Sequence, residues 1–319
     1  MRSDRRKFLS CSAAAVLPLP ALAQSYPNRP IKLVTGFPAG GPPDIVARLI
    51  APALSERLGQ QVIVENKPGA SANIASAQVA RTEADGYTIL LIVATNTINQ
   101  TLHPNLDFHI VRDFTPITGV MRVTNVLAVT PSMPVKTMAE FMAYAKANPG
   151  KLNFASSGSG SSPHITMEMF KAMAGVDMIH VPYSTNYFPD LLAGQTQVVC
   201  TAIPGILGFI RNGQMRALAV STDKRSDFLP DIPTISEFVP GYEASGWYGI
   251  VAPKNMPTPI VERLHRDINA VLADPKMKAR FPDFGGTEFT STPVGFGKFV
   301  GDEVEKWGKV IRDGKITAG

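Results

Sequence analysis

The stretch V-T-G-F-P-A-G-G-P-P-D-I-V-A-R-L-I-A-P-A-L-S-E-R-L, from Val34 to Leu58, decides how the rest of the sequence is interpreted. A short apolar strand, 31–35, leads through a Gly/Pro loop directly into an amphipathic helix. The first turn of a helix leaves backbone N–H groups unpaired and carries partial positive charge, so a ligand admitted there is well placed if it is an anion. The stretch predicts an anion site at a helix N-terminus, although the loop alone also fits an ordinary strand-to-helix turn.

The residue types of this loop set what it can offer a ligand. Gly40 and Gly41 leave room for close approach to the backbone. Pro42 and Pro43 fix φ for helix entry but have no N–H, so the loop has fewer donors than an all-glycine loop. Asp44 is suited to cap the helix. The apolar residues that we expect on the buried face of the helix are Ile45, Leu49, Leu54 and Leu58.

Strand-like and helical segments alternate along the chain. The further predicted strands are 61–65, 87–94, 120–130, 152–155, 178–181, 197–202, 216–221 and 245–252. The further predicted helices are 71–81, 137–146, 165–174, 186–193, 204–212, 259–273 and 294–312. This alternation favours βαβ units and an α/β fold, with ligands at the carboxyl ends of the strands.

Two more polar segments follow predicted strands. Residues 95–99, T-N-T-I-N, fit either a second ligand loop or a capped helix start. Residues 155–164, A-S-S-G-S-G-S-S-P-H, repeat the construction of the opening loop, with Ser162 suited to the N-cap and Pro163 to the first helical position. Two loops of the same construction thus lie in different halves of the chain.

Length and composition describe a folded protein of about two domains at roughly 150 residues each. The chain has 319 residues, of which 45% are hydrophobic, 18% are charged and 27 are proline. These proportions are typical of a globular protein with many firm turns. No stretch after the N-terminal region reaches the roughly 20 apolar residues of a membrane span.

The first 23 residues predict an export signal. They have a basic start, an apolar centre and the small-residue cleavage site Ala21-Leu22-Ala23. The run D-R-R-K-F-L at 4–9 resembles a twin-arginine signal, and a general secretory signal is the alternative. We therefore expect the mature protein in the periplasm.

Export changes the charge and the cysteine count. The signal holds four basic residues and one acidic one, so its removal lowers the formal charge from +5 to +2. That charge does not favour a nucleic-acid binder. Removal of Cys11 leaves Cys200 alone in an apolar strand, where we expect a buried inert thiol and no intrachain disulfide.

Catalytic and metal motifs do not account for the loops. The Gly/Ser run has the spacing neither of a P-loop nor of the G-x-S-x-G elbow of serine hydrolases. Ser159 and His164 fit a capping loop followed by a histidine in the first helical turn better than a catalytic pair. The five histidines show no metal-binding motif. Trp247 is compatible with lining a cleft and equally with core packing. We expect no enzyme activity, no cofactor and no metal.

Seven motifs in this order resemble the extracytoplasmic solute receptors of tripartite tricarboxylate transporters, the Bug group. They are Y-P-N-R-P-I-K-L-V-T-G-F-P-A-G-G-x-x-D-I-V-A-R (26–48), V-E-N-K-P-G-A (64–70), D-G-Y-T-I-L (85–90), N-F-A-S-S-G-S-G-S-S-P-H (153–164), H-V-P-Y (180–183), R-A-L-A-V-S-T-D-K-R-S (216–226) and L-P-D-I-P-T-I-S-E (229–237). The resemblance covers essentially the whole mature chain.

The resemblance implies a two-lobed, type II-like periplasmic-binding-protein fold with two crossing segments and a ligand cleft between the lobes. The expected lobes are 24–125 plus 247–319, and 126–246. They would close like a Venus flytrap on a small organic carboxylate, and the receptor, a monomer, would deliver it to the membrane permease subunits of the transporter. Two alternatives stay open: a ligand-binding partner of a sensor kinase, and an exported enzyme on the same fold.

The resemblance also implies that backbone groups and waters of the two Gly-rich loops hold the carboxylate. It places Phe37, Ala39, Gly40 and Gly41 on one jaw. It places Ser156, Ser157, Gly158 and Ser159 on the other. The remaining candidate ligand-binding residues are Asp44, Thr95, Asn96, His164, Tyr183, Ser184, Thr201 and Trp247.

The chain departs from the family pattern at three places. Pro42-Pro43 replace a Gly-Thr pair, S-T-N-Y-F at 184–188 replaces a start such as Lys-Gly, and 197–203 lacks the acid common in the family. These departures disfavour the usual aliphatic dicarboxylates. They favour an aromatic or less charged carboxylate that packs on Tyr187, Phe188 or Trp247.

Overall fold

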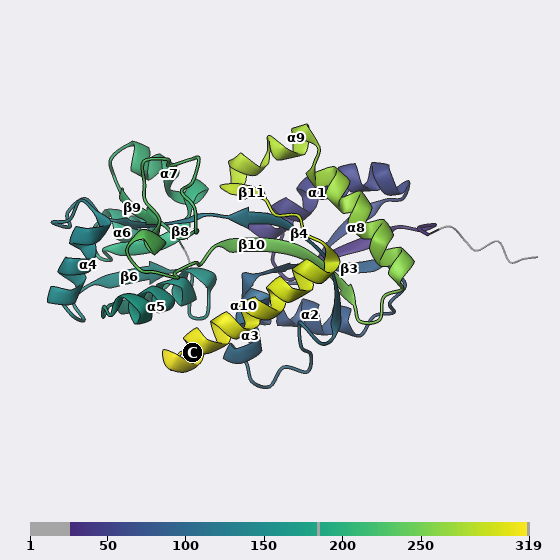
Figure 1. The fold of residues 1–319 in the computed structure, drawn as a ribbon, viewed down its shortest axis with the longest axis horizontal. Coiled ribbons are helices and arrows are strands. Elements are labelled where there is room, and N and C mark those ends of the chain that lie inside the picture. Colours follow the sequence, from purple (N-terminus) through teal and green to yellow (C-terminus); the bar gives the residue numbers. More distant parts are fainter. Residues whose placement is uncertain (1–25, 184–185, 318–319) are drawn as a thin grey trace, which may run out of the picture.

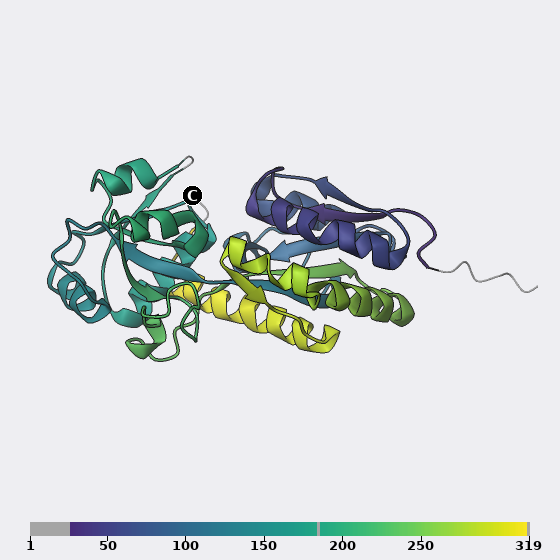
Figure 2. The same ribbon diagram turned by 90° about the horizontal axis from the view of Figure 1, so that it is seen from above.

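Two β-sheets, each covered by helices, form two lobes (Figure 1). The computed structural model describes residues 26–183 and 186–317. One sheet has six strands and the other has five. Viewed from above, the two lobes are joined by extended segments and one long helix (Figure 2). The predicted two-lobed α/β fold is confirmed.

The first lobe is built on the six-stranded sheet. Its parallel strands are β1 (Ile31–Thr35), β2 (Val62–Asn66) and β3 (Thr88–Val93), and its antiparallel strands are β4 (Phe114–Val123), β10 (Gly246–Pro253) and β11 (Gly286–Glu288). The strand order is β11-β4-β10-β3-β1-β2. The helices of this part are α1 (Pro42–Leu58), η1 (Ala70–Ala72), α2 (Asn73–Ala80), α3 (Ala94–Leu102), α8 (Thr258–Leu272), α9 (Pro275–Lys278), η3 (Phe281–Phe284) and α10 (Pro293–Asp313).

The second lobe is built on the five-stranded sheet. Its strands are β5 (Asn125–Val129), β6 (Asn153–Ser156), β7 (Ile179–Pro182), β8 (Val198–Ala202) and β9 (Arg216–Val220), in the order β7-β6-β8-β5-β9. β6 is parallel to β7 and β8, whereas β5 is antiparallel to β8 and β9. The helices are α4 (Met138–Ala147), α5 (Ser162–Ala174), α6 (Phe188–Leu192), α7 (Ile203–Arg211) and η2 (Ile235–Glu237).

Helix α1 begins and ends where its sequence predicts. Pro42 and Pro43 occupy the first two helical positions, and Gly59 ends the helix in the left-handed region at φ 67°. The predicted buried face is wrong at its start, because Ile45 is 39% exposed. The core side of the helix is instead formed by Val46, Ile50, Leu54 and Leu58. The buried stripe therefore starts one residue later than predicted.

The two lobes are joined at a pair of crossing segments that bond to one another. The chain passes from β4 to β5 at Thr124 and returns at Ala244 just before β10. The Asn125 side chain donates to the Ala244 carbonyl at 3.3 Å. Ser221 links the same two segments, because its N–H donates to the Asn125 carbonyl and its carbonyl accepts from the Ala244 N–H. These bonds link the two crossing segments directly to one another.

Helix α10 contributes to the hydrophobic cores of both lobes. Its first half packs Phe296 and Val300 against Trp247 and other residues of the first lobe. Its second half packs Trp307 and Ile311 into the cluster that forms the core of the second lobe. Figure 1 shows the helix running from one lobe to the other. Within the described ranges, neither this helix nor any other is both long and apolar enough to cross a bilayer.

Replacing Gly249 by alanine tests the contact between β10 and α10. A Cβ at Gly249 would lie 2.0 Å from Cζ of Phe296, a fully buried ring. We expect Gly249→Ala to lower the free energy of unfolding by about 1–3 kcal/mol, because the ring must be displaced from a packed core. Urea denaturation measures the change.

Gly301→Ala on the same helix is the matched control. A Cβ there meets nothing within 4 Å. Since alanine favours helix over glycine by up to about 1 kcal/mol, this variant should be as stable as the parent or more stable. Equal stability of the two variants would show that β10 and α10 are not closely packed.

Candidate functional site

A cavity of about 440 Å³ lies between the lobes and is lined by residues of both. The first lobe contributes Phe37, Pro42, Pro43, Ser71, Val93, Ala94, Thr95, Val123, Gly246, Trp247 and Tyr248. The second contributes Asn125, Ser157, Ser159, Gly160, Ser161, Ser162, Pro163, Thr201 and Ala202. The volume is in the range of small-molecule sites.

Four helices begin at this cavity. Pro42 and Pro43 start α1, Ala94 starts α3, Ser161 caps α5 and Ala202 caps α7. Each helix has nine residues or more. Helix N-termini carry unpaired N–H groups and partial positive charge. None of the described residues that line the cavity has an ionisable acidic or basic side chain apart from the Tyr248 phenol. The arrangement is suited to an anion whose charge is met by backbone groups and hydroxyls.

The glycines of the first jaw bond within their own loop. The N–H of Gly40 donates to Oδ2 of Asp44 at 2.8 Å, and the N–H of Gly41 donates to the Pro38 carbonyl at 3.2 Å. Ala39 and these three predicted site residues, Gly40, Gly41 and Asp44, are not among the residues that line the cavity. With proline at the next two positions, this jaw presents Phe37, Pro42 and Pro43, which is a mainly apolar surface.

Asp44 holds the first jaw in shape. It lies in the first turn of α1, whose N-cap is Gly41, so it bonds the loop instead of occupying the cap itself. Its carboxylate also accepts from Arg48 at 3.0 Å and from the Asn66 amide at 2.8 Å. Burial alone would raise the pKa of Asp44, but the bonds from Arg48, Gly40 and Asn66 hold the pKa below its ordinary value. The ionised carboxylate therefore braces the loop.

The second jaw presents serines. Ser157, Ser159 and Ser161 line the cavity. Ser161, not the predicted Ser162, is the N-cap of α5, because its backbone is extended (φ −66°, ψ 155°) while Ser162 is already helical. Gly158 is not among the lining residues, whereas Gly160 is, and both have positive φ. Compared with the first jaw, this loop has one proline, Pro163, in the first turn of its helix instead of two. The Ser161 hydroxyl donates to the Gly158 carbonyl at 2.7 Å, so the hydroxyls at the cavity that remain are those of Ser157, Ser159 and Ser162.

Ser156 and His164 lie behind the second jaw. Ser156 is fully buried, and its Oγ lies 2.6 Å from Nε2 of His180. The His164 ring stacks on the His180 ring with centroids 3.7 Å apart, and its Nδ1 accepts from the Gly160 N–H at 3.0 Å. Burial, together with His180 and Lys171, lowers the pKa of His164 to about 4. Both histidines are thus neutral at pH 7, and the bond from Gly160 to His164 holds the loop in place.

The predicted loop 95–99 is the start of α3. Its Thr95 lines the cavity. Asn96 is buried and engaged at both ends of its amide, since Oδ1 accepts from the Val93 N–H at 2.8 Å and Nδ2 donates to Ser76 at 3.0 Å. Of the two alternatives for this segment, the capped helix start is confirmed.

The remaining predicted residues divide between the cavity and the second-lobe core. Thr201 lines the cavity and accepts a bond from the Tyr187 hydroxyl at 2.9 Å. Tyr183 donates to Asp190 instead and is not a lining residue. Tyr187 and Phe188 pack in the core of the second lobe. Ser184 lies outside the described residues.

The aromatic wall of the cavity comes from β10. Trp247, predicted from the sequence, lines the cavity although it is only 2% exposed. Four lining features were not predicted as parts of the site: Tyr248, Asn125, Ser71 and the start of α7. Tyr248 and Asn125 reach the cavity through the pairing of the crossing strands, and Ser71 reaches it through the turn before α2. Burial raises the pKa of Tyr248 to about 12, so its hydroxyl is neutral at physiological pH.

We expect the stacked histidines to make the folded state less stable in acid. Their pKa lies below the ordinary value of 6.5 in the folded chain, so between pH 6.5 and about 4 only the unfolded chain takes up these protons. The free energy of unfolding should therefore fall as the pH drops through this window. We expect His164→Asn, which keeps an acceptor for Gly160, to reduce the loss between pH 7 and pH 4.5 by on the order of 1–2 kcal/mol, a figure discounted for solvent screening.

Chemical denaturation at each pH gives the measurement. Carboxylates that titrate in the same range are common to both proteins and cancel in the difference. Parallel pH profiles for the parent and His164→Asn would contradict the burial of the histidine pair.

Comparison with known proteins gives a consistent result. Residues 46–316 match the family model described as "Tripartite tricarboxylate transporter family receptor". The chain is 34% identical to protein BugT of Bordetella pertussis over 306 residues, which are 94% of each chain. It is similar in structure to R. palustris Rpa4515 with adipate (TM-score 0.79, 35% identity, 92% of this chain and 99% of that one). It is also similar to MatC of Rhodopseudomonas palustris with bound malate (TM-score 0.75, 29% identity, 90% and 100%).

Proposed function

Because the chain belongs to the tripartite tricarboxylate transporter family of receptors, we propose that it is a periplasmic receptor that captures a small organic carboxylate in the cavity between its lobes. The observation that carries the proposal is the meeting of four helix N-termini at a cavity whose described lining residues include no cationic side chain. Similar receptors with adipate and with malate support the ligand class.

The energetics of such a site are sufficient without an arginine. Micromolar retention requires about 8 kcal/mol. Hydrogen bonds to a charged group contribute about 1.5–3 kcal/mol each, and several N–H and hydroxyl donors are available at the starts of α3 and α5. Exclusion of water by closure strengthens these bonds further.

The unlike jaws favour a ligand with one charged end and one apolar end. The carboxylate would lie near the serines of the second jaw and the start of α3. The remainder of the ligand would pack against Phe37, the proline pair and Trp247, where each Å² of apolar area removed from water contributes about 25 cal/mol. A second carboxylate placed there would lose its hydration without gaining a cation as partner. The two prolines have no N–H group to donate to it.

The remaining parts of the proposal concern the whole receptor. The signal 1–23 would direct export, by the twin-arginine route in this proposal. The lobes, predicted as 24–125 plus 247–319 and 126–246, differ from the two sheets only in that β5 includes Asn125 and β10 includes Gly246. They would close by a hinge at the bonded crossing segments, and the monomeric receptor would hand its ligand unchanged to the permease subunits of the transporter. The predicted ligand-contacting residues that line the cavity are Phe37, Thr95, Ser157, Ser159, Thr201 and Trp247.

A thermal-shift screen of the mature chain tests the proposal. Hexanoate, benzoate, adipate and malate are the probes, with hexanol and benzyl alcohol as uncharged counterparts. A ligand at 100 times its dissociation constant stabilises the fold by about 2.7 kcal/mol. We expect hexanoate or benzoate to raise the melting temperature more than malate, and the alcohols to have no effect. Failure of every carboxylate to stabilise the protein would refute the proposed function.

Replacing Pro43 by alanine tests whether the proline pair of the first jaw disfavours ligands with a second carboxylate. The variant restores an N–H in the first turn of α1 and removes a ring from the cavity wall. We expect the affinity for malate to rise severalfold relative to that for hexanoate, as measured by calorimetry. Pro52→Ala, in the exposed part of the same helix, is the control and should leave the ratio unchanged. An unchanged ratio in Pro43→Ala would show that the proline pair does not set selectivity.

A further inference from the structure

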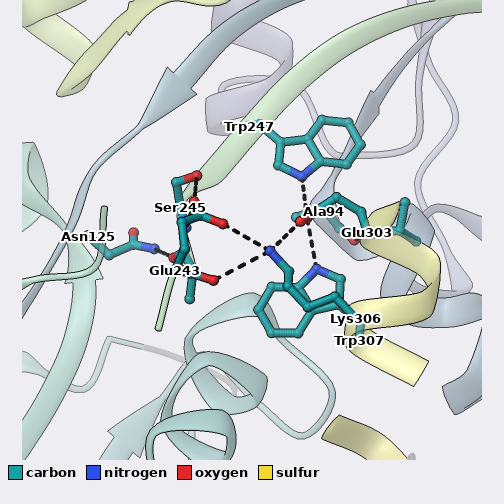
Figure 3. A network of polar contacts seen from close by, with 10 residues as sticks. Ala94, Asn125, Glu243, Ser245, Trp247, Glu303, Lys306 and Trp307 are labelled. Atoms are coloured by element: carbon teal, nitrogen blue, oxygen red, sulfur yellow. Dashed lines mark hydrogen bonds and ion pairs between the residues drawn. The ribbon is translucent and has the colours of Figure 1, made fainter. Parts of the chain in front are cut away.

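Both tryptophans of the chain donate to one buried carboxylate (Figure 3). The indole Nε1 of Trp247 lies 2.8 Å from Oε2 of Glu303, and that of Trp307 lies 2.9 Å from the same oxygen. Glu303 is 4% exposed and lies on α10. Trp247 belongs to the cavity wall, whereas Trp307 belongs to the core of the second lobe. One side chain therefore connects the wall of the site with the far lobe.

The other oxygen of this carboxylate is tied to the crossing segment. Oε1 of Glu303 forms an ion pair with Lys306, and the same ammonium lies 3.0 Å from Oε2 of Glu243. Glu243 lies just before β10 and also accepts from the backbone N–H of Ser245 at 3.0 Å. Burial would raise the pKa of Glu243, but Lys306 and Ser245 hold the pKa below its ordinary value. Figure 3 shows the chain of contacts from α10 to the start of β10.

The orientation of the Trp247 indole is fixed on several sides. Phe296 and Phe299 of α10 meet it in T-shaped contacts, with ring centroids 6.1 and 5.2 Å away. These apolar contacts do not satisfy the indole N–H. The bond from its N–H to Glu303 selects one orientation, because any other would leave a buried donor without its acceptor.

Burial of a carboxylate has a large desolvation cost, and an apolar side chain of similar volume would often stabilise the fold equally well. Its presence beside the cavity wall calls for another role. We propose that Glu303 is a positioning residue for ligand recognition, which holds the Trp247 indole as the wall against which the apolar part of a carboxylate ligand packs. The inference rests on the proposed function, since it requires a carboxylate in the cavity.

A comparison of two probes isolates this role. Hexanoate has a chain long enough to reach the indole wall, whereas propionate offers the same carboxylate with a short chain. Glu303→Leu removes the acceptor at nearly constant volume. We expect it to weaken hexanoate binding about tenfold, which is about 1.4 kcal/mol, and to change propionate binding less than twofold. Glu303→Gln, which keeps an oxygen acceptor, should recover most of the lost hexanoate affinity.

A double-mutant cycle separates positioning from a general structural effect. In the Trp247→Phe background there is no indole N–H to hold, so Glu303→Leu should cause no further loss of hexanoate affinity. The same tenfold loss in both backgrounds would overturn the inference. Glu305→Gln, an exposed position on the same helix, is the matched control and should bind hexanoate as the parent does.

Two further results keep the test decisive. If Glu303→Leu does not fold, Trp247→Phe alone must still lose hexanoate affinity about tenfold while retaining propionate, and full retention of hexanoate affinity would overturn the inference. If the parent binds hexanoate and Glu303→Leu binds it equally well, the inference fails but the proposed function stands. If the parent binds neither probe nor any carboxylate of the screen, the proposed function fails and the inference with it.

Discussion

An anion between the lobes must be stabilised by dipoles, because the described lining of the cavity supplies no cation. This constraint explains why α1, α3, α5 and α7 all start at the same place, although they belong to different lobes. It also explains why hydrogen bonds from neighbouring side chains hold each loop in place. Partial charges act only over the first turn of a helix, so the loops have to be held rigidly. Asp44 holds one loop through the Gly40 N–H, and the pair of neutral histidines holds the other through the Gly160 N–H.

The support on the two sides has different chemical consequences. In the first jaw, Asp44 and Pro38 use the N–H groups of Gly40 and Gly41, and the proline pair has none to offer. In the second jaw, His164 accepts from Gly160 and Ser161 donates to the Gly158 carbonyl, while Ser157, Ser159 and Ser162 still bring hydroxyl groups to the cavity. Two loops that look alike in the sequence thus become an apolar surface and a polar one. In the proposed function, this unequal number of free donors, and not overall charge, would set the selectivity between carboxylate ligands.

The resemblance to the receptor family implied the lining residues Phe37 and Ser157, and the single strand expected at 120–130 is instead divided at Thr124 between β4 and β5. Local sequence patterns were enough to predict most of the other strands and helices and the proline in the first turn of α1 and of α5. These features depend on neighbouring residues, whose spacing is visible in the chain. The bond between Gly40 and Asp44 was missed because a cap and a loop brace have the same residue signature. The contact of Trp247 with Glu303 joins residues 56 positions apart, and no periodicity indicates it. Tyr248 and Asn125 reach the cavity only through strand pairing across the sheets.

Helix α10 shares its apolar residues between two cores, with Phe296 in one and Trp307 in the other. Each lobe therefore lacks part of its hydrophobic interior unless the C-terminal helix is in place. Helix α10 follows the strands of both sheets along the chain, so neither core is complete until this helix has docked. A protein with this design gains little from folding one lobe ahead of the other.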